Sequence, residues 1–192
     1  ANLYLDLERE NSSYDYLETI KNKYYSVKVL NTHRLIGELR LIKSEEEVNR
    51  IRKAIEITIK GINTLMDNSK AGMKEYELEA YFDFVCKQNG VKDFAFKTIA
   101  ATGKNATILH YVDNDSELKD GDLILFDLGA QYKYYNADIS RTFPVNGKFT
   151  ERQKEVYNAV LRVNEKVIEA MKPGINYLEI NALAKDLIAE EC

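Results

Sequence analysis

The chain has 192 residues, of which 45% are hydrophobic and 30% are charged, a composition typical of a folded globular protein. Its formal charge of -4 at pH 7 is spread along the sequence, and no basic stripe could neutralise a run of phosphates, so we expect no nucleic-acid partner. The apolar runs are far shorter than the roughly 20 residues that cross a bilayer, so we expect no membrane partner. Two cysteines, Cys86 and Cys192, are too few for a disulfide framework and predict reduced thiols in a cytoplasmic protein.

The start of the chain predicts a small segment of mixed structure. A strand is expected over residues 3–7, a helix over about 13–23 and a second strand near 27–30, which is too little structure to enclose a core alone. We interpret residues 1–42 as the tail of a preceding domain followed by a linker. His33 has no metal-ligand pattern around it and is interpreted as a surface residue.

Two helices are predicted next, where apolar residues recur at steps of three and four. Ser44 and Glu47 form a capping box that opens the first helix, and the second is predicted over about residues 76–88, with Gly90 as its C-cap. The apolar stripe of the first helix consists of Val48, Ile51, Ile55, Ile59, Ile62 and Leu65. We expect this stripe to face the core.

Strand-like segments then dominate residues 94–145, before the chain returns to helices. Thr150 and Gln153 form a capping box that opens a third long helix, which residues 172–174 bring to an end. A last helix is predicted from about Asn176 to the end of the sequence. These helices and strands together predict an α+β fold.

A weak internal repeat relates the two helical parts of the sequence. When Gly72 is placed on Gly174, Glu77 meets Glu179, and apolar positions of the two following helices coincide. Chance similarity is the alternative explanation, because helix pairs share apolar spacing in general. If the repeat is real, the first half continues through its strands and the second half stops before them. The sequence then describes a domain with a complete first half and a truncated second half.

Asp127 and Asp138 are the candidate metal ligands. Asp127 lies inside an apolar strand at residues 122–129, where an unpaired buried carboxylate is costly. If the chain folds back near residues 132–133, Asp138 becomes its cross-strand neighbour on the same face. A divalent cation would then compensate the two like charges, and oxygen ligands suit Mn²⁺ better than a structural zinc. The alternative is that each aspartate pairs with a basic residue, for example Asp138 with Arg141.

The sequence around these aspartates resembles the metal-binding hairpin of the aminopeptidase P (Xaa-Pro aminopeptidase) family. The resemblance is carried by DLGA at residues 127–130 and by YYNADISRTFPVNGKF at residues 134–149. The run LHY at residues 109–111, followed by Asn114, is similar to the segment that carries the substrate-site histidine of that family. Residues 3–9 are similar to the late part of its N-terminal domain.

The resemblance implies a pita-bread fold, in which two related halves enclose a dinuclear metal centre. It implies an enzyme that releases the first residue from peptides with proline at the second position. Asp127 and Asp138 would bind two divalent metal ions, Mn or Co, with Asp138 bridging them. His110 would contact the substrate and assist proton transfer or stabilise the tetrahedral intermediate. The family's remaining ligands, a histidine and a pair of glutamates, are not matched, so we expect an incomplete metal site and an inactive fragment.

The resemblance also implies a domain division and leaves alternative functions open. Residues 1–42 would end an N-terminal creatinase-like domain and its linker, and residues 43–192 would form the N-terminal portion of the metallopeptidase catalytic domain. The full-length protein is expected to be a homo-oligomer. The alternatives are a prolidase, another pita-bread hydrolase such as a methionine aminopeptidase or a creatinase, and a non-catalytic binding module of the same fold. Residues 142–149 favour the proline-specific branch.

Overall fold

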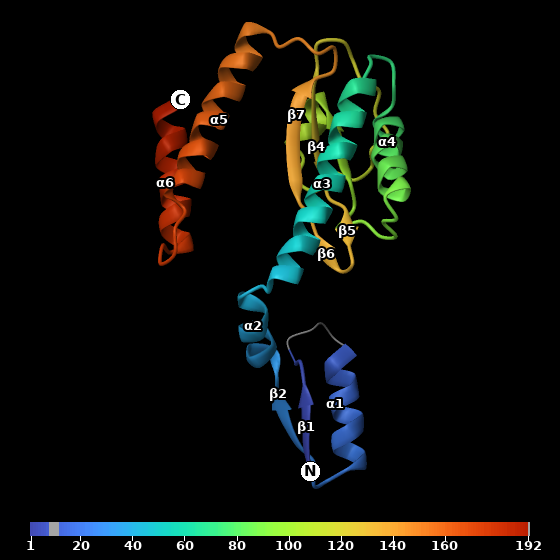
Figure 1. Ribbon diagram of the computed structural model, residues 1–192, viewed down its shortest axis with the longest axis vertical. Coiled ribbons are helices and arrows are strands. Elements are labelled where there is room, and N and C mark those ends of the chain that lie inside the picture. Colours follow the sequence, from blue (N-terminus) through green and yellow to red (C-terminus); the bar gives the residue numbers. More distant parts are fainter. Residues whose placement is uncertain (8–11, 192) are drawn as a thin grey trace. The chain divides into compact units, whose positions relative to one another are not determined.

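The computed structural model describes residues 1–7 and 12–191, and the chain divides into two compact units, Ala1–Arg52 and Lys53–Cys192 (Figure 1). Over these described ranges, none of the helices has both the length and the apolar character that crossing a bilayer requires.

The first unit is a short β-α-β segment followed by a helix. Its elements are β1 (Asn2–Leu5), α1 (Ser12–Lys23), β2 (Lys28–Asn31) and α2 (His33–Leu41). The strands pair in parallel, with Leu3 opposite Val29. The predicted strands and helix are confirmed within a few residues. Helix α2 was not predicted, because most of its apolar side chains are exposed and Thr32 provides no side-chain cap. His33 lies at the surface, with Nδ1 3.0 Å from Asp6 Oδ1.

The second unit contains an antiparallel sheet and two helical pairs. Its elements are α3 (Glu45–Asn68), which begins in the first unit, α4 (Glu75–Gln88), β3 (Ile99–Thr102), the 3-10 helix η1 (Gly103–Thr107), β4 (Leu123–Leu128), β5 (Gln131–Tyr132), β6 (Tyr135–Asn136), β7 (Ile139–Pro144), α5 (Glu151–Ala170) and α6 (Tyr177–Glu191). The sheet order is β3-β4-β7, and β5 pairs with β6 between β4 and β7. The predicted helices are confirmed, and the strands lie where the sequence places them.

Alternation along β4 decides which face of the sheet is buried. Ile124, Phe126 and Leu128 are fully buried, whereas Asp127 at the alternate position is partly exposed. The buried face packs against apolar side chains of α3 and α4, which lie over the same side of the sheet (Figure 1). Asp127 therefore points away from both helices, because successive residues of a strand point to opposite faces.

The two helical pairs share a capping pattern. Gly72 and Gly174, at equivalent positions before α4 and α6, have φ of +88° and +92°. Glu77 accepts a hydrogen bond from the backbone amide three residues before it at 2.6 Å, and Glu179 accepts the equivalent bond at 3.3 Å. The backbone conformation before α4 and α6 therefore repeats together with the sequence, as the internal repeat predicts.

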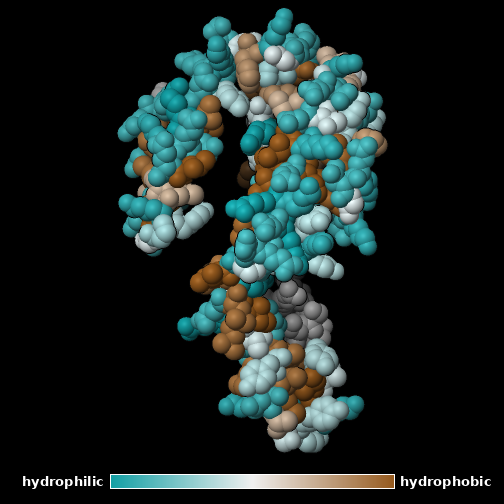
Figure 2. Space-filling model, viewed as in Figure 1, coloured by the Kyte–Doolittle hydropathy of each residue, from teal (hydrophilic) through white to brown (hydrophobic). Residues whose placement is uncertain are grey.

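Helices α5 and α6 pack on each other and leave most of their apolar side chains exposed (Figure 2). Val163 of α5 and Ile180 of α6 are their buried residues. The exposed apolar residues of the two helices include Val156, Val160, Leu161, Ile168, Leu178 and Ile188.

The expectations about cysteines and about the N-terminal resemblance fall partly outside the described residues. Glu8 and Arg9, in the segment that resembles an N-terminal domain, lie there, as does Cys192, one of the expected reduced thiols. Cys86 is a free thiol buried in α4, as predicted. Burial raises the pKa of Cys86 to about 12, so this thiol stays protonated and unreactive at neutral pH.

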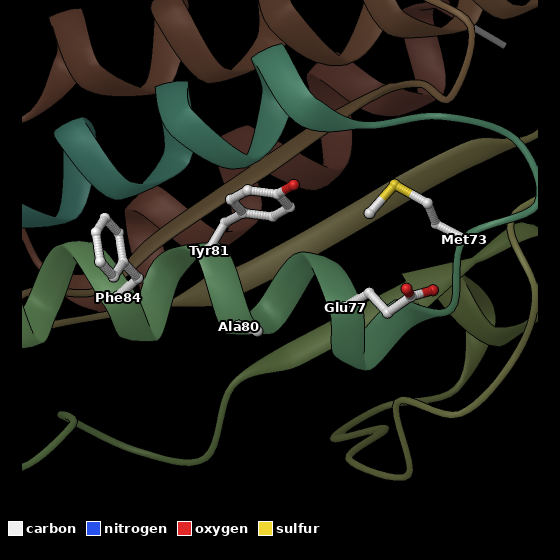
Figure 3. Close-up of a pocket in the computed structure, with 5 residues that line it drawn as sticks. All are labelled: Met73, Glu77, Ala80, Tyr81 and Phe84. Carbon is white, nitrogen blue, oxygen red and sulfur yellow. The ribbon is translucent and has the colours of Figure 1, made fainter.

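A shallow cavity of about 400 Å³ lies along α4. It is lined by Met73, Glu77, Ala80, Tyr81 and Phe84, and Figure 3 shows the rings of Tyr81 and Phe84 on one side of the helix. Its one carboxylate, Glu77, already caps α4. None of its residues is a predicted site residue, and the predicted site residues lie at a different cavity.

Candidate metal centre

The hairpin between β4 and β7 brings the candidate ligands together. Its turn residues, Lys133 and Tyr134, have φ of +49° and +69°, as in a type I′ turn. The reversal therefore lies one residue later than predicted. Its position was difficult to infer because the Asn-Gly or Asp-Gly pair that favours such a turn is absent from the sequence.

Gly129 allows the two arms of the hairpin to approach closely. A Cβ atom here would lie 1.8 Å from the carbonyl oxygen of Ala137 and 3.1 Å from the Cβ of Ala95, so only glycine fits. Hydrogen bonds hold the backbone on both sides, from Ala95 N to Gly129 O at 2.9 Å and from Ala137 N to Ala130 O at 3.0 Å. The backbone position of Asp138, directly after Ala137, is therefore set by main-chain contacts.

Asp127 and Asp138 lie on the same face of the hairpin as diagonal neighbours. The register pairs Asp127 with Ser140, and Asp138 stands two residues before Ser140. The prediction that the two aspartates are directly opposite each other is therefore wrong. Because the turn lies one residue later than predicted, the residue opposite Asp127 is Ser140 instead of Asp138. Ser140 Oγ donates to Asp127 Oδ1 at 3.0 Å.

Asp127 disfavours the ionisation of Asp138. Burial raises the pKa of Asp138, and Asp127 raises it further through its negative charge and through a hydrogen bond between the two side chains. Two carboxyl groups form such a bond only when one of them carries a proton. The pair therefore has the electrostatics of like charges held close together.

The alternative pairing with basic residues is not found. Arg141 Nη1 donates to the backbone oxygen of Ser140 at 2.8 Å rather than to Asp138. In the part of the chain that the structure describes, no ion pair includes Asp127 or Asp138. Both carboxylates are therefore available to a cation.

His110 shares a cavity with the two aspartates. The cavity has a volume of about 320 Å³ and is lined by Phe96, Lys97, Ile99, His110, Val112, Asp127 and Asp138. His110 follows η1 on an irregular segment, and its φ of +56° is uncommon for any residue except glycine. The structure thus brings together all three residues that the sequence singled out.

Phe96 and Lys97 were not identified from the sequence. They precede β3, and Ile99 of β3 pairs with Asp127 of β4, which places this segment beside the aspartates. No local pattern in residues 94–99 reveals a pairing with a strand so far along the chain. The signal that could have found them is the family resemblance, which the sequence also carries at residues 3–9, 109–114 and 127–149.

The donor set fits part of a divalent metal site. Oxygen ligands from Asp127 and Asp138 suit hard cations such as Mn²⁺. Positive charge between them would relieve the repulsion that, together with the larger effect of burial, raises the pKa of Asp138. Among residues 1–7 and 12–191, no group of three or more His, Cys, Asp or Glu side chains is arranged to hold a metal ion. The described residues therefore supply only some of the ligands that a metal pair needs.

The α-β half-domain has the fold of a metallopeptidase class, and its acidic hairpin lies within the residues that the family match covers. The sequence model of metallopeptidase family M24 matches residues 49–192, and the chain belongs to this family. The predicted pita-bread fold is confirmed, with the first half followed by the helical pair of the second.

Relatives are similar over much of the chain. An Xaa-Pro dipeptidase from Pyrococcus horikoshii is 38% identical over 177 residues, which cover 92% of this chain and 50% of that protein. An Xaa-Pro aminopeptidase from Escherichia coli is 42% identical over 146 residues, which cover 76% of this chain and 33% of that protein. A variant of Escherichia coli aminopeptidase P, solved in complex with substrate, has a TM-score of 0.90 and 33% identity over 99% of this chain and 45% of that one. The chain thus spans half or less of the length of these relatives.

Proposed function

We propose that this chain forms the first part of the catalytic domain of a metal-dependent peptidase that releases the first residue from peptides with proline at the second position. The observation that carries the proposal is the pair of uncompensated carboxylates, Asp127 and Asp138, in one cavity with His110. The names of the aminopeptidase and dipeptidase relatives support the substrate class. Residues 43–192 would belong to the catalytic domain, and residues 1–42 would end an N-terminal creatinase-like domain with its linker.

Asp127 and Asp138 would hold part of a pair of divalent metal ions, which we propose to be Mn, with Co as the alternative. A bound pair would polarise the carbonyl before proline and lower the pKa of water beside it. A solved relative described as zinc-substituted supports divalent metal use in the family. Ser140 supports the arrangement, because its hydroxyl fixes Asp127 by a hydrogen bond to Oδ1.

His110 would contact the substrate. Its ring is exposed at a cavity whose other walls include the apolar side chains of Phe96, Ile99 and Val112, so it can meet a peptide that enters there. An imidazole at this position can donate a hydrogen bond to the oxygen on which charge develops, or carry a proton toward the leaving amine. The cytoplasmic location and the assembly into a homo-oligomer also belong to this proposal, the former favoured by the free thiol of Cys86.

A prolidase is the second candidate, and the dipeptidase relative favours it. The same hairpin would serve both activities, so the distinction lies in substrate length. The complete protein should be assayed on an Xaa-Pro dipeptide and on longer peptides with proline at the second position. Cleavage of the longer peptides supports the aminopeptidase, and cleavage of the dipeptide alone supports the prolidase.

The metal assignment is tested by Asp138→Asn in the complete protein. We expect at least about a 100-fold loss of hydrolysis together with reduced metal content by elemental analysis, because a ligand charge is removed while the side-chain volume is kept. The matched control is Asp186→Asn on the exposed surface of α6, which should keep both metal and rate. A metal-loaded, fully active Asp138→Asn protein would reject the assignment.

A further inference from the structure

Glu75, the first residue of α4, is a carboxylate with no exposed surface and four hydrogen-bond donors around it. Its Oε1 accepts from Thr102 N at 2.7 Å and from Asn105 Nδ2 at 3.1 Å. Its Oε2 accepts from Tyr111 OH at 2.8 Å and from Ser116 N at 3.0 Å. A buried carboxylate is tolerated only when its oxygens are satisfied in this way.

These bonds hold a distant segment rather than the helix that carries Glu75. The four donors lie 27, 30, 36 and 41 residues along the chain, all between positions 102 and 116. The backbone amide of Glu75 also donates to Ser116 O at 3.0 Å. A residue that served only to start α4 would accept from amides of its own first turn, as Glu77 does from Lys74 N.

The held segment carries His110. Tyr111, whose hydroxyl binds Glu75, directly follows His110 and is 8% exposed, whereas His110 itself is exposed. Residues 109–116 form neither helix nor strand, so their own backbone pattern does not fix them. The positive φ of His110 also needs support from its surroundings, because this conformation costs free energy in a residue with a Cβ.

Asn114 provides a second buried attachment for the same segment. It is 4% exposed, and its side chain accepts from Ala100 N at 2.9 Å and donates to Thr98 O and Glu79 Oε2, both at 2.9 Å. His110 thus follows Asn105, a partner of Glu75, and precedes Asn114. Between these buried contacts, the exposed residues His110 and Val112 are the part of the segment that reaches the cavity.

We propose that Glu75 is a positioning residue, which fixes His110 beside Asp127 and Asp138 through its hydrogen bonds to Tyr111 and Ser116. This inference rests on the proposed function only in its prediction about kcat/KM. The anchoring of the segment by Glu75 is measured separately, by hydrogen exchange, and needs no activity.

The first experiment compares Glu75→Gln with wild type in the complete protein. Glutamine keeps the volume but replaces one acceptor oxygen with a donor, so at least one amide of the segment loses its partner. We expect kcat/KM for an Xaa-Pro peptide to fall about tenfold or more, with unchanged metal content. Glu77→Gln is the matched control on the same helix, and it should stay within about twofold because glutamine still accepts at this capping position.

A double-mutant cycle separates positioning from general damage. If Glu75 acts through His110, Glu75→Gln should cause no further loss of kcat/KM in a His110→Ala background. Tyr111→Phe is the milder second variant, with an expected loss of about threefold that also vanishes in that background. Losses that multiply in the double variants, or wild-type kcat/KM in Glu75→Gln, would overturn the proposal.

Hydrogen exchange tests the anchoring independently of any activity. Glutamine keeps one acceptor oxygen, so at least one of the amides of Thr102 and Ser116 should exchange at least about tenfold faster in Glu75→Gln than in wild type, and the amides of α5 should not change. If the wild-type protein cleaves no Xaa-Pro peptide, the proposed function fails while this measurement still decides the anchoring. Unchanged exchange at both amides would show that Glu75 does not hold the segment.

Discussion

The helical pair α3–α4 and the helical pair α5–α6 have the same local design and very different burial. Capping boxes open α3 and α5, and equivalent glycines of positive φ precede α4 and α6. Yet α3 buries six residues, whereas α5 buries only Val163. Local sequence therefore specifies the helices, and the strands that follow α4 provide the burial.

The comparison is sharpest at equivalent positions of α3 and α5. Thr58 of α3 is fully buried, and its Oγ1 accepts from Ala130 N at 2.9 Å, which ties α3 to the sheet. The equivalent residue of α5 under the internal repeat is Val160, which is 54% exposed. The exposed apolar side chains of α5 and α6 thus have the pattern of a face that packs on strands.

The two helical pairs should differ most in how far the free energy of unfolding falls when a leucine is replaced by alanine. Leu65→Ala in α3 removes a fully buried side chain and should lower the free energy of unfolding by about 3 kcal/mol. Leu161→Ala in α5, where the side chain is 39% exposed, should cost less than about 1 kcal/mol. Urea unfolding monitored by circular dichroism measures both. Equal losses would contradict the difference in burial.

An intermediate effect is expected where α3 touches α4. A Cβ at Gly61 would lie 2.4 Å from Phe82 Cδ2, so Gly61→Ala should destabilise by about 1–2 kcal/mol despite the better helix propensity of alanine. Gly37→Ala is the matched control in α2, where the new methyl group meets nothing within 4 Å. It should stabilise its helix by about 0.5–1 kcal/mol. Thermal unfolding measures both changes in stability. The packing argument would be contradicted if both substitutions stabilised the protein or both destabilised it.

The smallest expected effect concerns the acidic hairpin between β4 and β7, which follows α4 in the chain. The pKa of Asp138 is raised in the folded chain, so its ionisation disfavours folding, and stability falls as the pH rises from about the ordinary value of 3.8 through the raised folded value. With metal chelated, Asp138→Asn should remove this fall and stabilise the chain at pH 7 by well under about 1 kcal/mol, because the group is largely exposed. Unfolding curves at pH 4 and pH 7 measure the difference. A variant less stable than wild type at pH 7 would show that Asp138 is not under like-charge strain.

Most of the fold could be predicted because its signals are local. Capping boxes at Ser44 and Thr150 opened helices in the right places. Apolar spacing assigned the buried face of α3 only in part, because Ile55 and Ile59 of the expected stripe are 36% and 45% exposed. Helix α2 escaped prediction because it has neither a side-chain cap nor a buried residue. Its assignment needs tertiary context rather than a stronger pattern.

The sequence predicted which residues lie together at the candidate site better than it predicted their arrangement. Asp127, Asp138 and His110 lie at one cavity, but the cross-strand partner of Asp127 is Ser140, because the turn is one residue later than expected. Glu75 gave no signal, because a carboxylate at a helix start is ordinary in sequence. Only its distance from solvent and its long-range hydrogen bonds distinguish it.

The close approach at Gly129 has a practical consequence for engineering. Because the contact joins main-chain atoms of Gly129 and Ala137, the spacing of the two arms does not depend on the side chains at the tip of the hairpin. Tyr134 at that tip is 90% exposed. An epitope or a fluorescent label placed there would report on the hairpin while leaving the carboxylates where the backbone puts them.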